Sequence, residues 1–155
     1  GCDHAQLSLV TRHNVADCKS NSTIKSVASG KAVAEFKGLV YVAQDAQRTD
    51  AQQTNRNVEL GGGHIVSEPQ LEIYADDVKC SHGATNGSLD ENELFYLRSR
   101  GIPYKEAQLL QQQAFAFAVL DKISTEELKE RMISLTEQRL RGEFSKCKNC
   151  CKNCC

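Results

Sequence analysis

Short β-forming segments, separated by polar or glycine residues, are the feature that most restricts the fold of this chain, and they run from about Ile24 to Val78. They are rich in β-branched and aromatic residues, which suit the pleated surface of a sheet. No amphipathic helical pattern lies between them, which argues against strands joined by crossover helices. This part of the chain is therefore predicted to be mainly β. The clearest segments are Lys31–Phe36, Gly38–Val42, His64–Val66 and Leu71–Ala75.

The stretch from Thr49 to Asn57 is almost wholly polar but contains neither glycine nor proline, so it need not be a flexible loop. Threonine and asparagine side chains can stack as ladders between successive rungs of a solenoid. A parallel β-helix and an antiparallel sandwich both fit the pattern. No Asn-Gly or Asp-Gly turn joins two apolar strands here, and this favours the solenoid.

After Gly87 the pattern changes to amphipathic helix. Three start signals follow in order: capping boxes at Ser88 and Ser124, and between them Pro103, which suits a first helical turn. We expect three helices, with the change from strand to helix between residues 83 and 88. Their apolar stripes can cap the open end of the β part or present an apolar groove to another protein.

Composition excludes two classes of function. The 19 Lys and Arg residues are balanced by 20 Asp and Glu residues, so nucleic-acid binding is not expected. The longest nearly apolar run, Ala114–Leu120, is far shorter than the roughly 20 residues that cross a bilayer. Gly1–Val10 has no signal-peptide pattern, and Cys2, Cys18 and Cys80 are isolated rather than arranged as a disulfide framework. We therefore expect a cytoplasmic protein without a membrane span.

The segment from Ile73 to Thr85 holds the most reactive side chains in the body of the chain. Alternate side chains of a strand face the same side, so Cys80 and His82 are expected to project together. Their Cα atoms would be about 7 Å apart, near enough to ligate one metal centre or cluster if the strand bends. Ordinary packing of a cysteine beside a hydrogen-bonded histidine fits the same spacing. The spacing alone leaves both interpretations open.

A cysteine hydrolase or transferase is a third interpretation, with Cys80 as nucleophile, His82 as base and Asp76 as orienting carboxylate. Residues two apart on one strand meet poorly in the geometry that a thiol and its base require. No helix N-terminus is predicted at Cys80 to lower its pKa. We therefore expect no enzymatic activity.

The last residues repeat Lys-Asn-Cys-Cys and contain two C-x-x-C spacings, which suit zinc or another soft metal. A tail of Ser, Lys, Asn and Cys cannot build a core, so residues 143–155 are expected to be disordered without metal. A terminal artefact is the plain alternative. The candidate ligands are Cys147, Cys150, Cys151, Cys154 and Cys155.

Several long motifs resemble the SufB/SufD family of iron–sulfur cluster assembly proteins. They are HNVADCKSNSTIKSV from His13, FKGLVYVAQDAQRTDAQQTNRN from Phe36, PQLEIYADDVKCSHGAT from Pro69 and LDENELFYLRSRGIP from Leu89. The resemblance covers residues 10 to 142, in the same order as in the C-terminal region of the family. VKCSHGAT followed by LFYLRSRGI favours the SufD branch. The cysteine-rich tail lies outside the pattern.

The resemblance implies a fold and a role. The fold is a right-handed parallel β-helix over residues 1–87 and a helical domain over residues 88–142. The role is that of a non-enzymatic scaffold subunit, pairing with a SufB-like paralogue through the β-helix and docking a SufC-like ATPase through the helices, in the cytoplasm or the plastid stroma. His82, with Cys80 beside it, would lie at the interface where a transient iron–sulfur cluster assembles. The alternative function is a metal-sequestering or zinc-stabilised binding module built on the tail.

Overall fold

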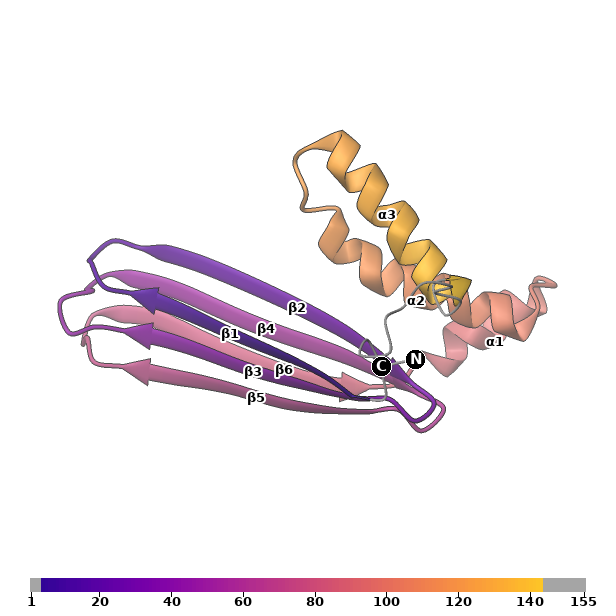
Figure 1. Ribbon diagram of the computed structural model, residues 1–155, viewed down its shortest axis with the longest axis horizontal. Coiled ribbons are helices and arrows are strands. Elements are labelled where there is room, and N and C mark those ends of the chain that lie inside the picture. The colour runs from indigo at the N-terminus through magenta and orange to yellow at the C-terminus, as the bar shows by residue number, and fades with distance from the viewer. Residues whose placement is uncertain (1–3, 144–155) are drawn as a thin grey trace, which may run out of the picture. The chain divides into compact units, whose positions relative to one another are not determined.

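The computed structural model describes residues 4–143, and within them the chain forms six strands and three helices (Figure 1). The chain divides into two compact units, one ending at Gly87 and the other beginning at Ser88. Of the expected cysteine-rich tail, only Glu143 is among the described residues.

The β unit consists of two parallel sheets, and successive strands alternate between them. One sheet has the order β1-β3-β5 and the other the order β2-β4-β6. Figure 1 shows the strands of both sheets running side by side. The prediction of a mainly β first half followed by helices is therefore confirmed. The strands are β1 (His4–His13), β2 (Lys19–Ser29), β3 (Val33–Val42), β4 (Thr49–Leu60), β5 (His64–Ile73) and β6 (Val78–Gly87).

The strand pairs have a regular register although the sequence shows no regular period. Lys19 pairs with Asp50, 31 residues later, and Thr49 pairs with Val78, 29 residues later. Because each pair joins residues about 30 positions apart, a local sequence pattern does not reveal the register.

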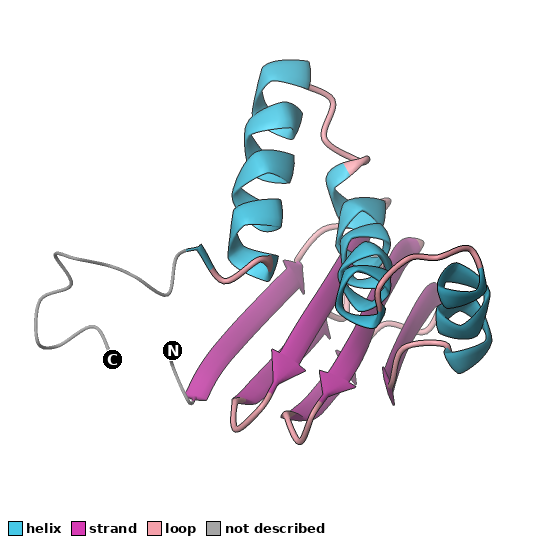
Figure 2. Cartoon of the chain, turned by 90° about the vertical axis from the view of Figure 1, so that its right-hand side faces the viewer, coloured by secondary structure: helices cyan, strands magenta, loops and turns pink. Residues whose placement is uncertain are grey.

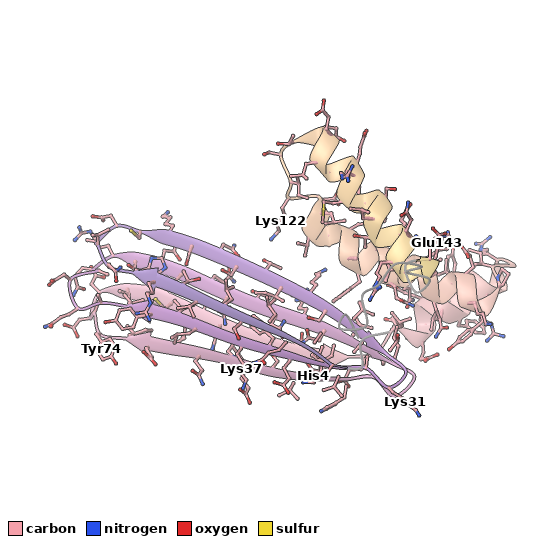
Figure 3. The ribbon with its side chains drawn as sticks, viewed as in Figure 1. His4, Lys31, Lys37, Tyr74, Lys122 and Glu143 are labelled. Carbon is pink, nitrogen blue, oxygen red and sulfur yellow. The ribbon has the colours of Figure 1, made fainter. Side chains whose placement is uncertain are left out.

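β3 is longer than predicted because the two predicted segments on either side of Lys37 form one strand. Lys37 points away from the sheets, as Figure 3 shows, and its Nζ is 3.7 Å from a carboxylate oxygen of Glu68 on β5. Gly38 faces the interior, where a Cβ would collide with the side chains of Phe36 and Gln53. These two residues therefore join the segments around them into one strand, β3.

The polar stretch from Thr49 to Asn57 is a strand, and its inward side chains form a ladder rather than a loop. Asn57 Nδ2 donates to Oδ1 of Asn55 at 2.6 Å and to Oδ1 of Asn86, on β6, at 2.8 Å. The Ser67 hydroxyl, on β5 of the facing sheet, donates to the same Asn55 oxygen at 2.6 Å. Polar side chains thus link both neighbouring strands and facing sheets, beside an apolar cluster of Val40, Val42, Ala46, Ala51 and Ala75.

The run from Gly61 to Gly63 is the turn between β4 and β5, as the sequence indicates. Gly61 and Gly62 have φ values of +56° and +98°, which favour glycine. At Gly63 the constraint is steric, because a Cβ there would lie 2.5 Å from the backbone carbonyl of Ala28. The turn therefore stacks closely on the end of β2.

We expect Gly63→Ala to lower the free energy of unfolding by about 1–3 kcal/mol, the usual cost of forcing an extra group into a packed site. The matched control is Gly83→Ala, where an added Cβ meets no described atom within 4 Å. Urea unfolding of both variants measures the difference. Equal stabilities would show that the turn at residues 61–63 can move away from the end of β2 without cost.

The second unit contains three helices in the part that the structure describes (Figure 2): α1 (Glu91–Ser99), α2 (Tyr104–Leu120) and α3 (Glu126–Leu140). Two predicted starts were misplaced. Asp90, not Ser88, caps α1, because its carboxylate accepts the free N–H groups of the first turn at 2.8 and 3.2 Å. Thr125, not Ser124, precedes α3, and its side chain makes no capping bond. Pro103 occupies the N-cap of α2, next to the first turn where it was expected.

None of the helices among residues 4–143 is long and apolar enough to cross a membrane.

Candidate functional site

The candidate site lies on β6, which forms one edge of the sheet β2-β4-β6. Its start is held by Asp77, whose carbonyl accepts the Arg48 N–H at 2.6 Å and whose N–H donates to Oε1 of Gln47 at 2.9 Å. These two bonds tie the beginning of β6 to the turn before β4. The side chains that follow along β6 are placed by this anchor and by the register with β4.

The backbone of β6 presents hydrogen-bonding groups at the free edge. The Asp50 N–H donates to the carbonyl of Cys18, the residue before β2, at 2.9 Å, so alternation directs the next residue, Ala51, toward β6. In a parallel pair, the residue opposite a donating position directs its own N–H and C=O away from the partner. Cys80 is opposite Ala51 and His82 is opposite Gln53. The backbone groups of Cys80 and His82 therefore lie at the edge, where another strand could bind them.

The corresponding edge of the other sheet is blocked. β5 carries Pro69, which has no N–H. The N–H groups of His64 and Tyr74 donate at 3.0 and 2.9 Å to the carbonyls of Ala32 and Val42, just before and at the end of β3, so alternation directs position 69 away from β3. Proline at such a position preserves the pairing with β3 but weakens pairing on the outer side. β6 has no proline, so of the two edges formed by the last strands of the sheets, β5 and β6, it is the open one.

Cys80 and His82 share the inward-facing side of β6, as the alternation predicted. Their partners Ala51 and Gln53 are both buried, at 1% and 0% exposed. Cys80 is half-buried and packs against the apolar cluster, whereas His82 is exposed. The structure therefore places the thiol partly in the interior and leaves the imidazole accessible on β6.

Cys80 is not an activated nucleophile. Burial raises the pKa of its thiol most; a hydrogen bond from the Ala51 backbone opposes this rise, and the Asp50 carboxylate adds to it. Asp76 lies in a bend before β6, so the alternation that aligns Cys80 with His82 does not extend to it. The raised pKa and the position of Asp76 do not provide the activated thiol and aligned carboxylate that the hydrolase interpretation needs.

We expect Cys80 to react with iodoacetamide more slowly in the folded chain than in the urea-unfolded chain at pH 7.5. The thiolate is the reacting species, and a raised pKa lowers its fraction at neutral pH. The folded-state rate should rise as the pH approaches the raised pKa. Mass spectrometry of the Cys80 peptide measures both rates, and faster reaction in the folded chain would contradict the assignment.

Residues 4–143 contain no group of three His, Cys, Asp or Glu side chains that are close enough together to hold a metal ion. The five predicted cysteine ligands of the tail lie outside the described residues, so that site stays a prediction. Cys80 and His82 supply at most two ligands. A metal or cluster held there needs further ligands from outside the described residues.

Two polar residues were missed by sequence reasoning. His13 is 5% exposed, and its Nε2 lies 2.9 Å from the Ser20 hydroxyl. Gln53 is fully buried directly beside His82 in the register. The available signal for Gln53 was its place in the polar stretch, two residues before Asn55 and therefore on the same face of the strand. Nothing local indicates that His13 is buried.

The fold and the site define a class of protein: two parallel sheets, of which an open edge carries a thiol and an imidazole, followed by a helical unit. The family model described as "SUF system FeS cluster assembly, SufBD core domain" matches residues 1–115. The chain belongs to this family, whose role is iron–sulfur cluster assembly. The resemblance stated from the motifs is confirmed.

Three relatives illustrate the match. The iron–sulfur cluster assembly protein SufD of Escherichia coli K12 is 47% identical over 131 residues, which are 84% of this chain and 31% of the relative. The chloroplastic protein ABCI7 of Arabidopsis thaliana is 40% identical over 67% of this chain and 22% of its own length. SufD of Bacillus subtilis is 32% identical over 68% of this chain and 24% of its own length. The chain thus spans between a fifth and a third of these relatives.

Proposed function

We propose that this chain is part of a non-enzymatic scaffold subunit of an iron–sulfur cluster assembly complex. In this proposal the β unit pairs with a SufB-like paralogue and the helical unit docks a SufC-like ATPase. The observation that carries it is the open edge of β6, with His82 exposed beside Cys80. The name of the E. coli relative supports a role in cluster assembly, and a bacterial and a chloroplastic relative fit the proposed location in the cytoplasm or the plastid stroma.

The proposal includes the finer description of the fold. We infer that the two sheets are walls of a right-handed parallel β-helix over residues 1–87, with the helical domain over residues 88–142. Two features support this inference: successive strands alternate between the sheets, and their register repeats every 29 to 31 residues. A β-helix of this kind leaves unpaired strand edges at its last rung, where a partner can add strands.

The proposed chemistry at the edge is ligation of a nascent cluster. The cluster is cargo rather than a resident cofactor, and imidazole and thiolate are both known cluster ligands. Cys80 and His82 supply two ligands, so the partner strand must supply the others. Because burial raises the pKa of the Cys80 thiol, iron has to displace its proton, and ligation should weaken as the pH falls.

The helical unit offers a surface suited to a protein partner. α1 exposes Phe95 and Tyr96, at 74% and 57%, and the Arg100 guanidinium lies 5.2 Å from the centre of the Tyr96 ring. α3 exposes an apolar stripe along one side of the helix, made of Leu128, Met132 and Leu135. Aromatic residues, methionine and arginine are enriched where proteins bind each other. These surfaces support docking of the ATPase to the helical unit.

Co-purification tests the proposal. The protein that carries this chain is co-expressed with SufB and SufC, each tagged in turn. We expect both tags to retain it, and we expect cluster reconstitution to require all three proteins. Retention by neither tag would contradict the proposed function, whatever the behaviour of single variants.

A further inference from the structure

Gln53, in β4, is a buried side chain whose polar end has no partner. It is 0% exposed, and neither Nε2 nor Oε1 has a hydrogen-bond partner within the described part of the chain. A buried amide left in this state costs about 1–3 kcal/mol. Since nearly all buried polar groups in native proteins are satisfied, an exception calls for a functional or solvent partner.

The amide of Gln53 lies in the layer next to His82. The two residues are register partners in the pair of β4 with β6, and alternation places both side chains on the inward face. On the facing sheet, Gly38 leaves the space that the amide fills, because a Cβ there would collide with Gln53 Nε2. Pro69 covers Gly38 in the same way that His82 covers Gln53. Neighbouring strands are about 4.8 Å apart, so a ring rotation or one water joins imidazole and amide.

The adjacent inward positions of β4 offer His82 no comparable acceptor. Ala51 has no polar side-chain atom. Oδ1 of Asn55 already accepts two hydrogen bonds, each of 2.6 Å. Gln53 is therefore the one inward side chain of β4 beside His82 whose carbonyl oxygen is unused.

We propose that Gln53 is the positioning residue for His82. Its Oε1 accepts the N–H of one ring nitrogen, which leaves the lone pair of the other nitrogen directed to the open edge. Histidines that ligate metals commonly donate their second N–H to a carbonyl or carboxylate, and this fixes the tautomer and the ring orientation. The inference rests on the proposed role of His82 in cluster ligation and adds the group that prepares His82 for it.

The test is the tautomer of His82, read from the ring ¹⁵N shifts of the full chain at one fixed pH. We expect a single His82 tautomer in the unmodified chain. In Gln53→Met, which keeps the length and volume of the side chain, we expect the mixture of both tautomers that a freely exposed imidazole shows. Gln52→Met is the matched control, because Gln52 is the neighbouring residue and faces outward and exposed. An unchanged His82 tautomer in Gln53→Met would overturn the proposal.

A reciprocal measurement covers the case in which Gln53→Met does not fold. His82→Ala changes an exposed residue, and it should shift the side-chain NH₂ resonances of Gln53; unshifted resonances would overturn the proposal. Cluster yield separates this inference from the proposed function. If His82→Ala lowers the yield while Gln53→Met changes neither tautomer nor yield, positioning fails alone. If Gln53→Met shifts the tautomer while His82→Ala keeps full yield, the proposed role of His82 in cluster ligation fails and positioning stands.

Discussion

Replacing Ala84 by proline should weaken pairing with the SufB-like partner while leaving the chain folded. Ala84 follows His82 at the same alternation, so its N–H lies at the free edge of β6 rather than toward β4. Proline there removes one donor of the edge and places a ring against any strand that approaches it. An unpaired carbonyl on the partner costs about 1–3 kcal/mol, which corresponds to a rise in Kd of about tenfold to a hundredfold.

The chain itself provides a precedent for this substitution. Pro69 occupies the outward-directed alternation of β5, and β5 remains paired with β3 along its whole length. The residue before the substitution is Gly83, whose missing Cβ avoids the usual clash with a following proline. Ala84→Val is the control, because it adds bulk and keeps the N–H. Unaltered binding of Ala84→Pro, measured by retention on tagged SufB, would show that the partner does not use this edge.

Replacing His82 by alanine should reduce cluster formation by about tenfold or more, because loss even of an outer partner of a metal ligand costs about 10- to 100-fold. The complex should still assemble, since His82 is exposed and its side chain holds no described element in place. The ratio of cluster absorbance to protein in the purified complex measures the yield.

The matched control is His64→Ala. The His64 side chain is 66% exposed, and its Nδ1 lies 3.3 Å from a carboxylate oxygen of Glu59, at the other end of the β unit's strands. We expect its cluster yield to be unchanged. A His82→Ala complex with full yield would remove His82 from the site and leave the open edge as a binding surface only.

The sequence predicted most where the physical cause is local. Alternation along an extended strand placed Cys80 and His82 on one face, and the structure agrees. The glycine run at residues 61–63 forms a turn between two strands, and the positive φ angles there favour glycine. Capping residues predicted three helices, with errors of one or two residues at Ser88 and Ser124, because several polar residues near each start can fill the N-cap.

Strand length could not be predicted at residues whose role is set by a distant neighbour. Lys37 interrupts an apolar run because it faces outward beside Glu68, and Gly38 interrupts it because Gln53 fills the space of its side chain. The exposure of Leu128 and Phe95 was equally hidden, since an amphipathic stripe looks the same whether it is covered or not. In each case the deciding contact lies far away in the sequence.

By itself, the sequence determined the classes of element, their order and the placement of Cys80 and His82 on one face of β6, because strand alternation, glycine turns and helix caps act over a few residues. Its motifs also determined the family. The tertiary structure alone decided which strand edge is open, that Cys80 is half-buried while His82 is exposed, and that Gln53 lies beside the imidazole. Those outcomes depend on pairing between residues 29 to 31 positions apart, and no local pattern encodes which strands pair or which side chains the pairing buries.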